Sequence, residues 1–225
     1  MKSRGKPHNK KNTRASLKRP SLPRKAAVPA RSAESLTSWG NVADWYAEHL
    51  TEAGTYHEKV IGPNLLRLLG PHRGRTVLEI GCGEGYFTRL LQGDGHTVIG
   101  SDISSALIQK ARSYDDRISY HVTPADRLAF AADGIFTAVF AALSLQNMEH
   151  IEPVFREASR VLAPKGRFVG VLNHPAFRIP GHSSWGFDEA QRVQYRRIDS
   201  YLSASRREID MTPGKQGGKE FTVSF

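Results

Sequence analysis

The chain has 225 residues, of which 39% are hydrophobic, so it can bury one sizeable core with or without tails. Its formal net charge of +10 suggests a nucleic-acid partner until the charge is divided along the chain. Eleven of the 32 basic residues lie in residues 1–33, which contain no acidic residue, and the remainder holds 21 basic against 22 acidic residues. The basicity therefore belongs to an N-terminal tail, and the body is close to neutral.

Residue types disfavour several further classes of protein. The single cysteine, Cys82, cannot form an internal disulfide and suits a reducing compartment, so the expected location is the cytoplasm. No run of about 18 apolar residues marks a membrane span. The N-terminus lacks the apolar stretch of a secretory signal. The histidines are scattered without the spacing of ligands, and no metal site is expected.

Residues 1–37 are predicted to be a disordered basic tail, because Lys, Arg, Pro and Ser dominate and little can be buried. Such an arm could bind RNA or another polyanion, since each basic side chain at a phosphate releases counterions. No aromatic residue interleaves the charges before Trp39, which favours a merely solvated tail. Nucleic acid is thus a possible partner through this tail, but not the favoured one.

Residues 38–225 are predicted to form one domain that begins with helices. Apolar residues recur at helical spacing from Val42 to Leu50 and from Tyr56 to Leu69. From Thr76 onward, short apolar strands alternate with amphipathic helices. The predicted strands cover residues 76–80, 96–102, 118–122, 136–142 and 167–172. This alternation favours an α/β fold with a Rossmann-like, doubly wound, mostly parallel sheet.

Ligands of such sheets bind beyond the carboxyl ends of the strands, which draws attention to the loop from Gly81 to Gly85. Its glycines permit a sharp turn and close approach of a ligand, and the next helix offers free N–H groups. Asp102 closes the second strand 21 residues after Gly81, where a carboxylate can hold ribose hydroxyls. The spacing G-x-G-x-G differs from the dinucleotide fingerprint, and Glu79 would repel a pyrophosphate while suiting an ammonium group. These features favour S-adenosylmethionine as the ligand.

Residues 77–85, Val-Leu-Glu-Ile-Gly-Cys-Gly-Glu-Gly, resemble the first motif of class I methyltransferases. Residues 160–168, Arg-Val-Leu-Ala-Pro-Lys-Gly-Arg-Phe, resemble the segment that leads into the fifth strand of that family. The resemblance covers about residues 39–173, and further runs as far as Arg197 resemble a bacterial subgroup of the ubiquinone/menaquinone-biosynthesis-like clan. It implies S-adenosylmethionine as cofactor and methyl transfer to a small-molecule acceptor.

The resemblance also assigns residues to the cofactor, with Glu79 at the methionine end, Asp102 at the ribose and Ile103 against the adenine. Cys82 has a plainer interpretation as a small residue in a tight turn. The full set of predicted cofactor-binding residues is Glu79, Gly81, Cys82, Gly83, Asp102, Ile103, Ala125, Asp126 and Leu143.

Acceptor-side residues are predicted from the N-terminal helices and from the loops after strands four and five. They are Tyr46, His57, Gln146, Asn147, Arg178 and Tyr195. His174 is the candidate catalytic base, although a loop histidine bonded to backbone would look the same. Helix capping by Gln146 and Asn147 and a solvated charged helix at residues 195–197 stay open as alternatives. Transfer from a sulfonium needs no general acid, so the lack of an obvious dyad excludes nothing.

Three features depart from the family pattern. Pro124 and Thr137 stand where the family usually or often has Asp, and only residues 221–225 follow the segment after strand five. The domain is therefore expected to have a core at residues 75–173, a substrate-side segment at residues 174–225 and incomplete C-terminal strands, as in a truncated chain. Two alternatives remain open: an RNA or ribosomal-protein methyltransferase recruited by the basic tail, and an inactive cofactor-binding remnant.

Overall fold

The structure, a computed structural model, describes residues 39, 43–51, 54–70, 75–174, 182–201, 203, 205–210 and 219–224. The predicted tail at residues 1–37 lies outside the described residues, as does Arg178. Of Tyr46, only the backbone is described.

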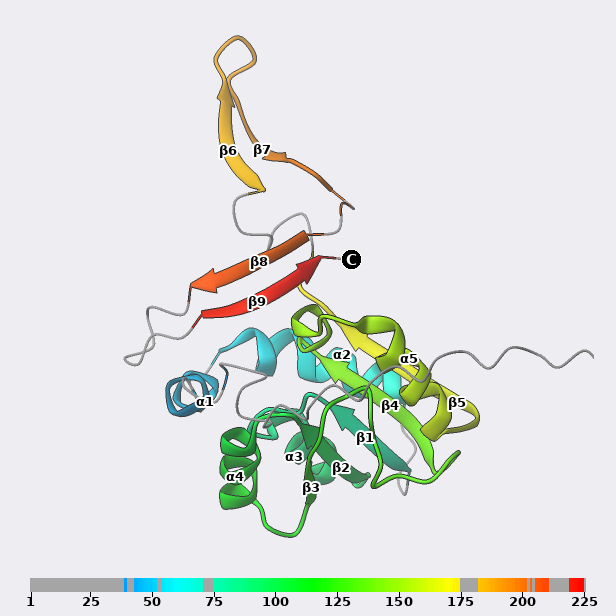
Figure 1. The fold of residues 1–225 in the computed structure, drawn as a ribbon. Helices are drawn as coiled ribbons and strands as arrows, with labels where there is room; N and C mark the ends of the chain where they lie inside the picture. The colour runs from blue at the N-terminus through cyan, green and yellow to red at the C-terminus, as the bar shows by residue number, and fades with distance from the viewer. Residues whose placement is uncertain are drawn as a thin grey trace, which may run out of the picture. The chain divides into compact units, whose positions relative to one another are not determined.

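A five-stranded sheet forms the centre of the fold, with strand order β3-β2-β1-β4-β5 and every neighbouring pair parallel (Figure 1). The strands are β1 (Thr76–Ile80), β2 (Thr97–Asp102), β3 (Ser119–Val122), β4 (Phe136–Ala142) and β5 (Leu162–Val171). The order reverses between β1 and β4, and this is the position where doubly wound sheets bind ligands. The predicted mostly parallel α/β sheet is confirmed.

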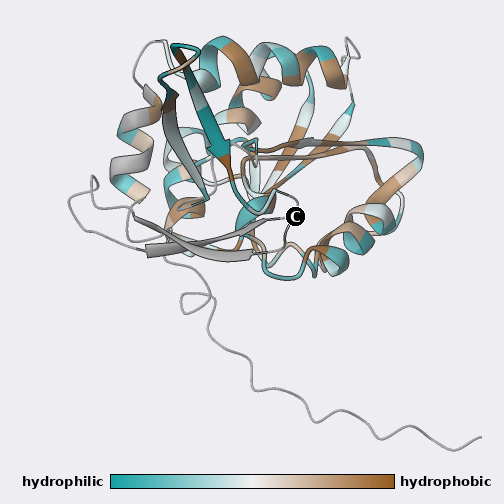
Figure 2. Ribbon diagram, turned by 90° about the horizontal axis from the view of Figure 1, so that it is seen from above, coloured by the Kyte–Doolittle hydropathy of each residue, from teal (hydrophilic) through white to brown (hydrophobic). Residues whose placement is uncertain are grey.

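Helices cover both faces of this sheet, which explains why its central strands β1 and β4 are largely buried. They are α1 (Ala43–Thr51), η3 (His57–Ile61), α2 (Gly62–Leu69), α3 (Tyr86–Gly93), α4 (Ser105–Tyr114), η4 (Leu145–Asn147) and α5 (Ile151–Val161). On β1, Val77 packs with the apolar residues of α2 and α3, whereas Leu78 packs with those of α5. Figure 2 shows hydrophilic and hydrophobic residues alternating along the helices, as expected where one side faces the sheet and the other faces water.

Two elements differ from the sequence expectation. The fifth strand begins at Leu162 rather than at residue 167, and the predicted turn appears as an irregularity in its pairing with β4, with Lys165 at φ 64°. Residues 195–197 lie in a strand, so the alternative of a charged helix is wrong. The sequence alternates there with a period of two, from Trp185 to Phe187 and from Val193 to Tyr195, as strands do.

The strands that follow β5 pair with one another and not with the central sheet. β6 (Ser183–Asp188) pairs with β7 (Val193–Ile198), and β8 (Ser205–Asp210) pairs with β9 (Lys219–Ser224), both antiparallel. Within the described residues, the central sheet therefore ends at β5. Among all the helices that the structure describes, none is long and apolar enough to cross a membrane.

Candidate functional site

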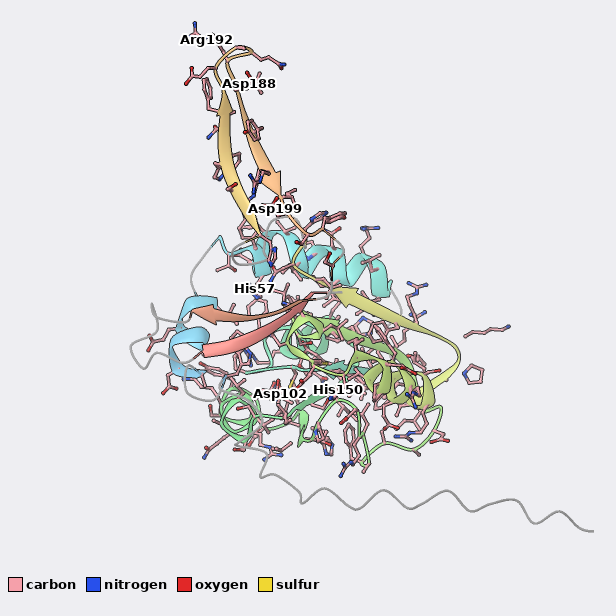
Figure 3. The ribbon with its side chains drawn as sticks, turned by 45° about the horizontal axis from the view of Figure 1, so that its top comes forward. His57, Asp102, His150, Asp188, Arg192 and Asp199 are labelled. Carbon is pink, nitrogen blue, oxygen red and sulfur yellow. The ribbon has the colours of Figure 1, made fainter. Side chains whose placement is uncertain are left out.

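A cavity of about 380 Å³ lies at the carboxyl ends of the central strands. All nine residues predicted to bind a cofactor line this one cavity, although they come from the ends of four different strands. His57 and Asn147, two of the predicted acceptor-side residues, line it as well. Figure 3 labels His57 and Asp102, which belong to the N-terminal helices and to the end of β2.

The glycine-rich loop after β1 is held tightly on one side and is open on the other. Gly81 has φ 68°, and a Cβ added to it would lie 2.5 Å from the Cβ of Ser144, which follows β4. The Ser144 hydroxyl donates a hydrogen bond to the carbonyl of Ile80 at 2.9 Å, so the two loops are joined. Gly83, with φ 55°, has no atom within 4 Å of the corresponding position. The backbone at Gly83 therefore has room beside it that any larger residue would occupy.

Asp102 is fixed by the backbone around it. Its Oδ2 accepts a hydrogen bond from the N–H of Gly83 at 2.9 Å, and its Oδ1 accepts one from the N–H of Ser104 at 2.9 Å. A carboxylate oxygen is an acceptor to which a hydroxyl can donate. The loop and the acid that the spacing suggested as partners are thus in direct contact, with the carboxylate oriented before any ligand arrives.

Glu79 is a buried acid in the wall of the cavity, with a side chain 1% exposed. The hydroxyl of Thr88 donates a hydrogen bond to its Oε2. Burial raises the pKa of Glu79 to about 8, because a charged carboxylate is poorly solvated there, and the negative charges of Glu84 and Asp102 act in the same direction. A cation placed beside this carboxyl group would reverse that effect.

Comparison with known proteins relates this chain to methyltransferases. Residues 78–170 match the model of a family described as "Methyltransferase domain". A solved S-adenosylmethionine dependent methyltransferase from Mesorhizobium loti superimposes with a TM-score of 0.60 and 27% identity, over 72% of each chain. Residues 78–170 form a class I methyltransferase domain.

Curated relatives match about half of this chain. A demethylmenaquinone methyltransferase of Tropheryma whipplei (strain Twist) is 37% identical over 113 residues, which are 48% of this chain and 46% of the relative. A malonyl-[acyl-carrier protein] O-methyltransferase of Erwinia pyrifoliae is 28% identical over 130 residues, 58% of this chain and 47% of the relative. The chain thus spans about half the length of these curated relatives. S-adenosylmethionine is the methyl donor that such a domain implies.

The residues of the methyltransferase domain fit that donor. The space beside Gly83 can accept a ligand against the backbone, and the buried carboxyl group of Glu79 lies where an ammonium group would compensate its charge. Asp102 presents two fixed acceptors to a pair of hydroxyls. No group of three or more His, Cys, Asp and Glu side chains is arranged to hold a metal ion within the described ranges.

Arg160, from the second motif of the methyltransferase domain, supports the loop after β3 that carries Ala125 and Asp126. Its guanidinium donates to the carbonyls of Leu128 at 3.1 Å and Ala131 at 2.9 Å, two positions further along that loop. Ion pairs with Asp133 at 2.6 Å and Glu157 at 2.8 Å hold the guanidinium in place. Arg160, which lies in α5, therefore stabilises the loop that forms one wall of the cavity.

The loop after β4 contains a strained backbone position and a buried amide oxygen that lacks a hydrogen-bond partner among the described residues. Leu143 has φ 56°, a left-handed conformation that non-glycine residues seldom adopt and that concentrates at functional sites. The side-chain amide of Gln146 donates to the carbonyl of Leu143 at 2.8 Å, which supports this turn. The Oδ1 of Asn147 is buried and lacks a hydrogen-bond partner among the described residues. Asn147 lines the cavity, whereas Gln146 does not.

His57 belongs to a π-helical turn, a rare conformation that is frequent at functional sites. Its ring stacks on Phe87 at 5.4 Å between centroids and 20° between planes, and it meets Tyr86 edge-on at 5.8 Å. The N-terminal segment is thus attached to α3 directly beside the glycine-rich loop.

Two predicted residues lie elsewhere. His174 is exposed, stacks on Tyr201 at 6.4 Å between ring centroids, and is not part of the cavity lining. Tyr195 lies in β7, also outside the lining. The catalytic role of His174 and the acceptor role of Tyr195 stay predictions, as do those of Tyr46 and Arg178.

The structure adds lining residues that the sequence reasoning did not select. Among them are Trp39, Glu84, Ser144, Met148, Glu149 and His150. Three of these continue the loop after β4 beyond Asn147, where the prediction stopped. His150 stands at the N-cap position of α5 without a capping hydrogen bond from its side chain, so sequence alone could suggest only a helix start there.

Proposed function

We propose that this chain transfers a methyl group from S-adenosylmethionine to a small-molecule acceptor. The observation that carries this proposal is the meeting of nine predicted cofactor residues in one cavity at the switch point of a methyltransferase-type sheet. When bound, the cofactor supplies an activated methyl group on a sulfonium, whose leaving group is a neutral thioether.

In this proposal, different residues of the chain bind different parts of the cofactor. Glu79 receives the ammonium group, and Asp102 accepts hydrogen bonds from the ribose hydroxyls. Ile103 and Ala125 enclose the adenine, and Asp126 takes the recognition role at its edge, since Pro124 has no polar side chain. The buried position of Glu79 and the backbone bonds of Asp102 support this arrangement, because both groups are oriented in advance.

The acceptor side lies between His57 and Asn147. The Oδ1 of Asn147, which has no hydrogen-bond partner among the described residues, can accept a hydrogen bond from a hydroxyl or amine of the methyl acceptor. The His57 imidazole can take a proton when the acceptor is protic, and His174 remains a second candidate for this task. Apolar neighbours such as Phe87 and Met148 exclude water from the reacting groups. The buried thiol of Cys82 suits a reducing, cytoplasmic location.

The relatives suggest which acceptors to try first. Demethylmenaquinone and malonyl-[acyl-carrier protein] represent the two relatives, by their names, and RNA represents the alternative that the basic tail raises. We expect methyl-labelled S-adenosylmethionine to label a small-molecule fraction, with S-adenosylhomocysteine formed in equal amount. Label found only in RNA would replace the proposed acceptor class. An absence of S-adenosylhomocysteine with every acceptor, despite cofactor binding, would favour the inactive remnant.

A further inference from the structure

The hairpin formed by β6 and β7 has an unusually apolar surface for an exposed element. Its exposed large side chains include Trp185 (65% exposed), Phe187 (52%), Val193 (50%), Tyr195 (48%) and Ile198 (36%). A two-stranded hairpin is at best marginally stable in water. Exposing these apolar side chains to water gains the hairpin no stability. Exposed apolar patches often mark interaction sites, so the hairpin is a candidate binding surface.

The register of the hairpin separates these side chains into two faces of different charge. Directly paired residues share a face, and the pairs alternate from one face to the other. We call one side the aromatic face; it consists of Ser183, Trp185, Phe187, Gln194, Arg196 and Ile198. The opposite face consists of Ser184, Gly186, Asp188, Val193, Tyr195 and Arg197. The aromatic face thus has one cation and no carboxylate, whereas the opposite face has Asp188.

Arg196 is held beside the largest aromatic residue of that face. Its guanidinium carbon lies 5.3 Å from the ring centroid of Trp185, and its Nη2 donates to the hydroxyl of Ser183 at 2.7 Å. On the opposite face, Arg197 forms an ion pair with Asp199 at 2.9 Å. A positive charge set among Trp, Phe and Ile is suited to a surface that is both apolar and anionic.

We propose that the aromatic face binds the interfacial layer of an anionic lipid membrane. Trp and Phe favour the boundary between headgroups and acyl chains, and Arg196 can pair there with lipid phosphates. The sequence adds a second signal, the eleven basic and no acidic residues of positions 1–33, and stable peripheral binding usually takes two. This inference does not depend on the proposed methyl transfer.

Two features distinguish a membrane from RNA as the partner, and they also indicate an orientation. Bases stack on planar side chains, whereas the aromatic face includes the branched aliphatic Ile198, which favours acyl chains. The turn of the hairpin carries Asp188 and Glu189, and Figure 3 labels Asp188 and Arg192 there. Asp188, Glu189 and Arg192 together give the turn a net charge of −1, which an anionic surface would repel, so the hairpin would lie along the interface and not enter by its tip.

Co-sedimentation of the full chain with phosphatidylcholine vesicles, with and without phosphatidylglycerol, tests the proposal. The double variant Trp185→Ser/Phe187→Ser should bind vesicles containing phosphatidylglycerol at least about 10-fold more weakly. The matched control Val193→Ser/Tyr195→Ser, which changes two apolar residues of the opposite face, should stay within about twofold of the unaltered chain. Far-ultraviolet circular dichroism would confirm that both variants fold.

A spectroscopic measurement separates insertion from mere attraction by the basic tail. Lipids brominated near the headgroup should quench the fluorescence of Trp185, and Trp185→Phe should bind normally but lose this quenching. Equal binding by the two double variants, or unchanged quenching in Trp185→Phe, would overturn the proposal. The proposal would also be overturned if Trp185→Ser/Phe187→Ser lost binding to a single-stranded RNA while its binding to vesicles stayed unchanged, because the face would then recognise RNA.

Discussion

Thr88 of α3 donates a hydrogen bond to the carboxyl group of Glu79 in β1, across the base of the glycine-rich loop. The bond joins the strand that leads into the loop to the helix that leaves it, and it positions the acid in the cavity wall. Because this carboxyl group is 1% exposed, burial raises its pKa to about 8, and the hydrogen bond from Thr88 only partly offsets that rise.

Glu79 should make the stability of the cofactor-free protein depend on pH. Its pKa is higher in the folded chain than the ordinary value of 4.5, so its stabilising contribution is complete below 4.5 and is lost as pH rises through about 8. Urea unfolding should therefore show a falling free energy of unfolding over that range, by on the order of a few kcal/mol. Glu79→Gln, whose amide does not titrate, should flatten the curve. Parallel curves for the two proteins would contradict this account.

Cofactor binding should release a proton from the same group. Placing an ammonium beside Glu79 favours its ionised form, so about one proton should leave on binding near pH 7. Calorimetry of S-adenosylhomocysteine in buffers of different ionisation enthalpy measures this number directly. The affinity should rise with pH up to about 8 in the unaltered protein and should not do so in Glu79→Gln. A release of zero protons would show that the ammonium group binds elsewhere.

The two glycines at the start of the loop should respond differently to alanine. Gly81→Ala places a Cβ 2.5 Å from Ser144 at a left-handed φ, so it should lower the free energy of unfolding by about 2 kcal/mol or more. Gly83→Ala has space for the new methyl group, so it should cost about 1 kcal/mol of folding but weaken cofactor binding about 10-fold. Thermal unfolding and calorimetry separate the two effects. Gly93→Ala, in a helix with no close neighbour, is the control.

Arg160 should matter for stability and for the loop that it braces. Arg160→Ala leaves the carbonyl of Ala131 without its side-chain donor, removes one of the two donors to the carbonyl of Leu128 and removes two ion pairs, so we expect a loss of about 1–3 kcal/mol. Arg156→Ala, which breaks only an exposed pair with Glu152, should change stability by less than about 0.5 kcal/mol. Hydrogen exchange at residues 127–131 should accelerate in the first variant alone. Equal exchange rates in both would show that the brace is unimportant.

Sequence reasoning predicted the central sheet well because short segments rich in apolar residues alternate with amphipathic helices. That the predicted cofactor residues would meet in one place was also predictable, since a parallel sheet brings the carboxyl ends of its strands to one edge. Glycine spacing and the position of Asp102 then select the loops that matter. The hydrogen bond from Gly83 to Asp102 confirms that these two features meet.

The acceptor side was harder to predict, for physical reasons. Contacts such as the stacking of His57 on Phe87 join distant segments, and no local pattern reports them. The partner of Glu79 was missed because Thr88 has the spacing of an ordinary helix residue. The β6–β7 hairpin was missed because its charges suggested a solvated helix, although the alternation of Trp185 and Phe187 indicates a strand.

The most direct test of the central claim is calorimetric titration of the full chain with S-adenosylhomocysteine, alongside the variants Asp102→Asn and Asp116→Asn. We expect the unaltered protein and the Asp116 variant to bind one molecule alike, because Asp116 is exposed and lies outside the cavity. Asp102→Asn should bind about 10- to 100-fold more weakly, since it loses a charge-assisted acceptor for the ribose. Tighter binding of NADH than of S-adenosylhomocysteine, or binding that Asp102→Asn leaves unchanged, would contradict the assignment of this cavity.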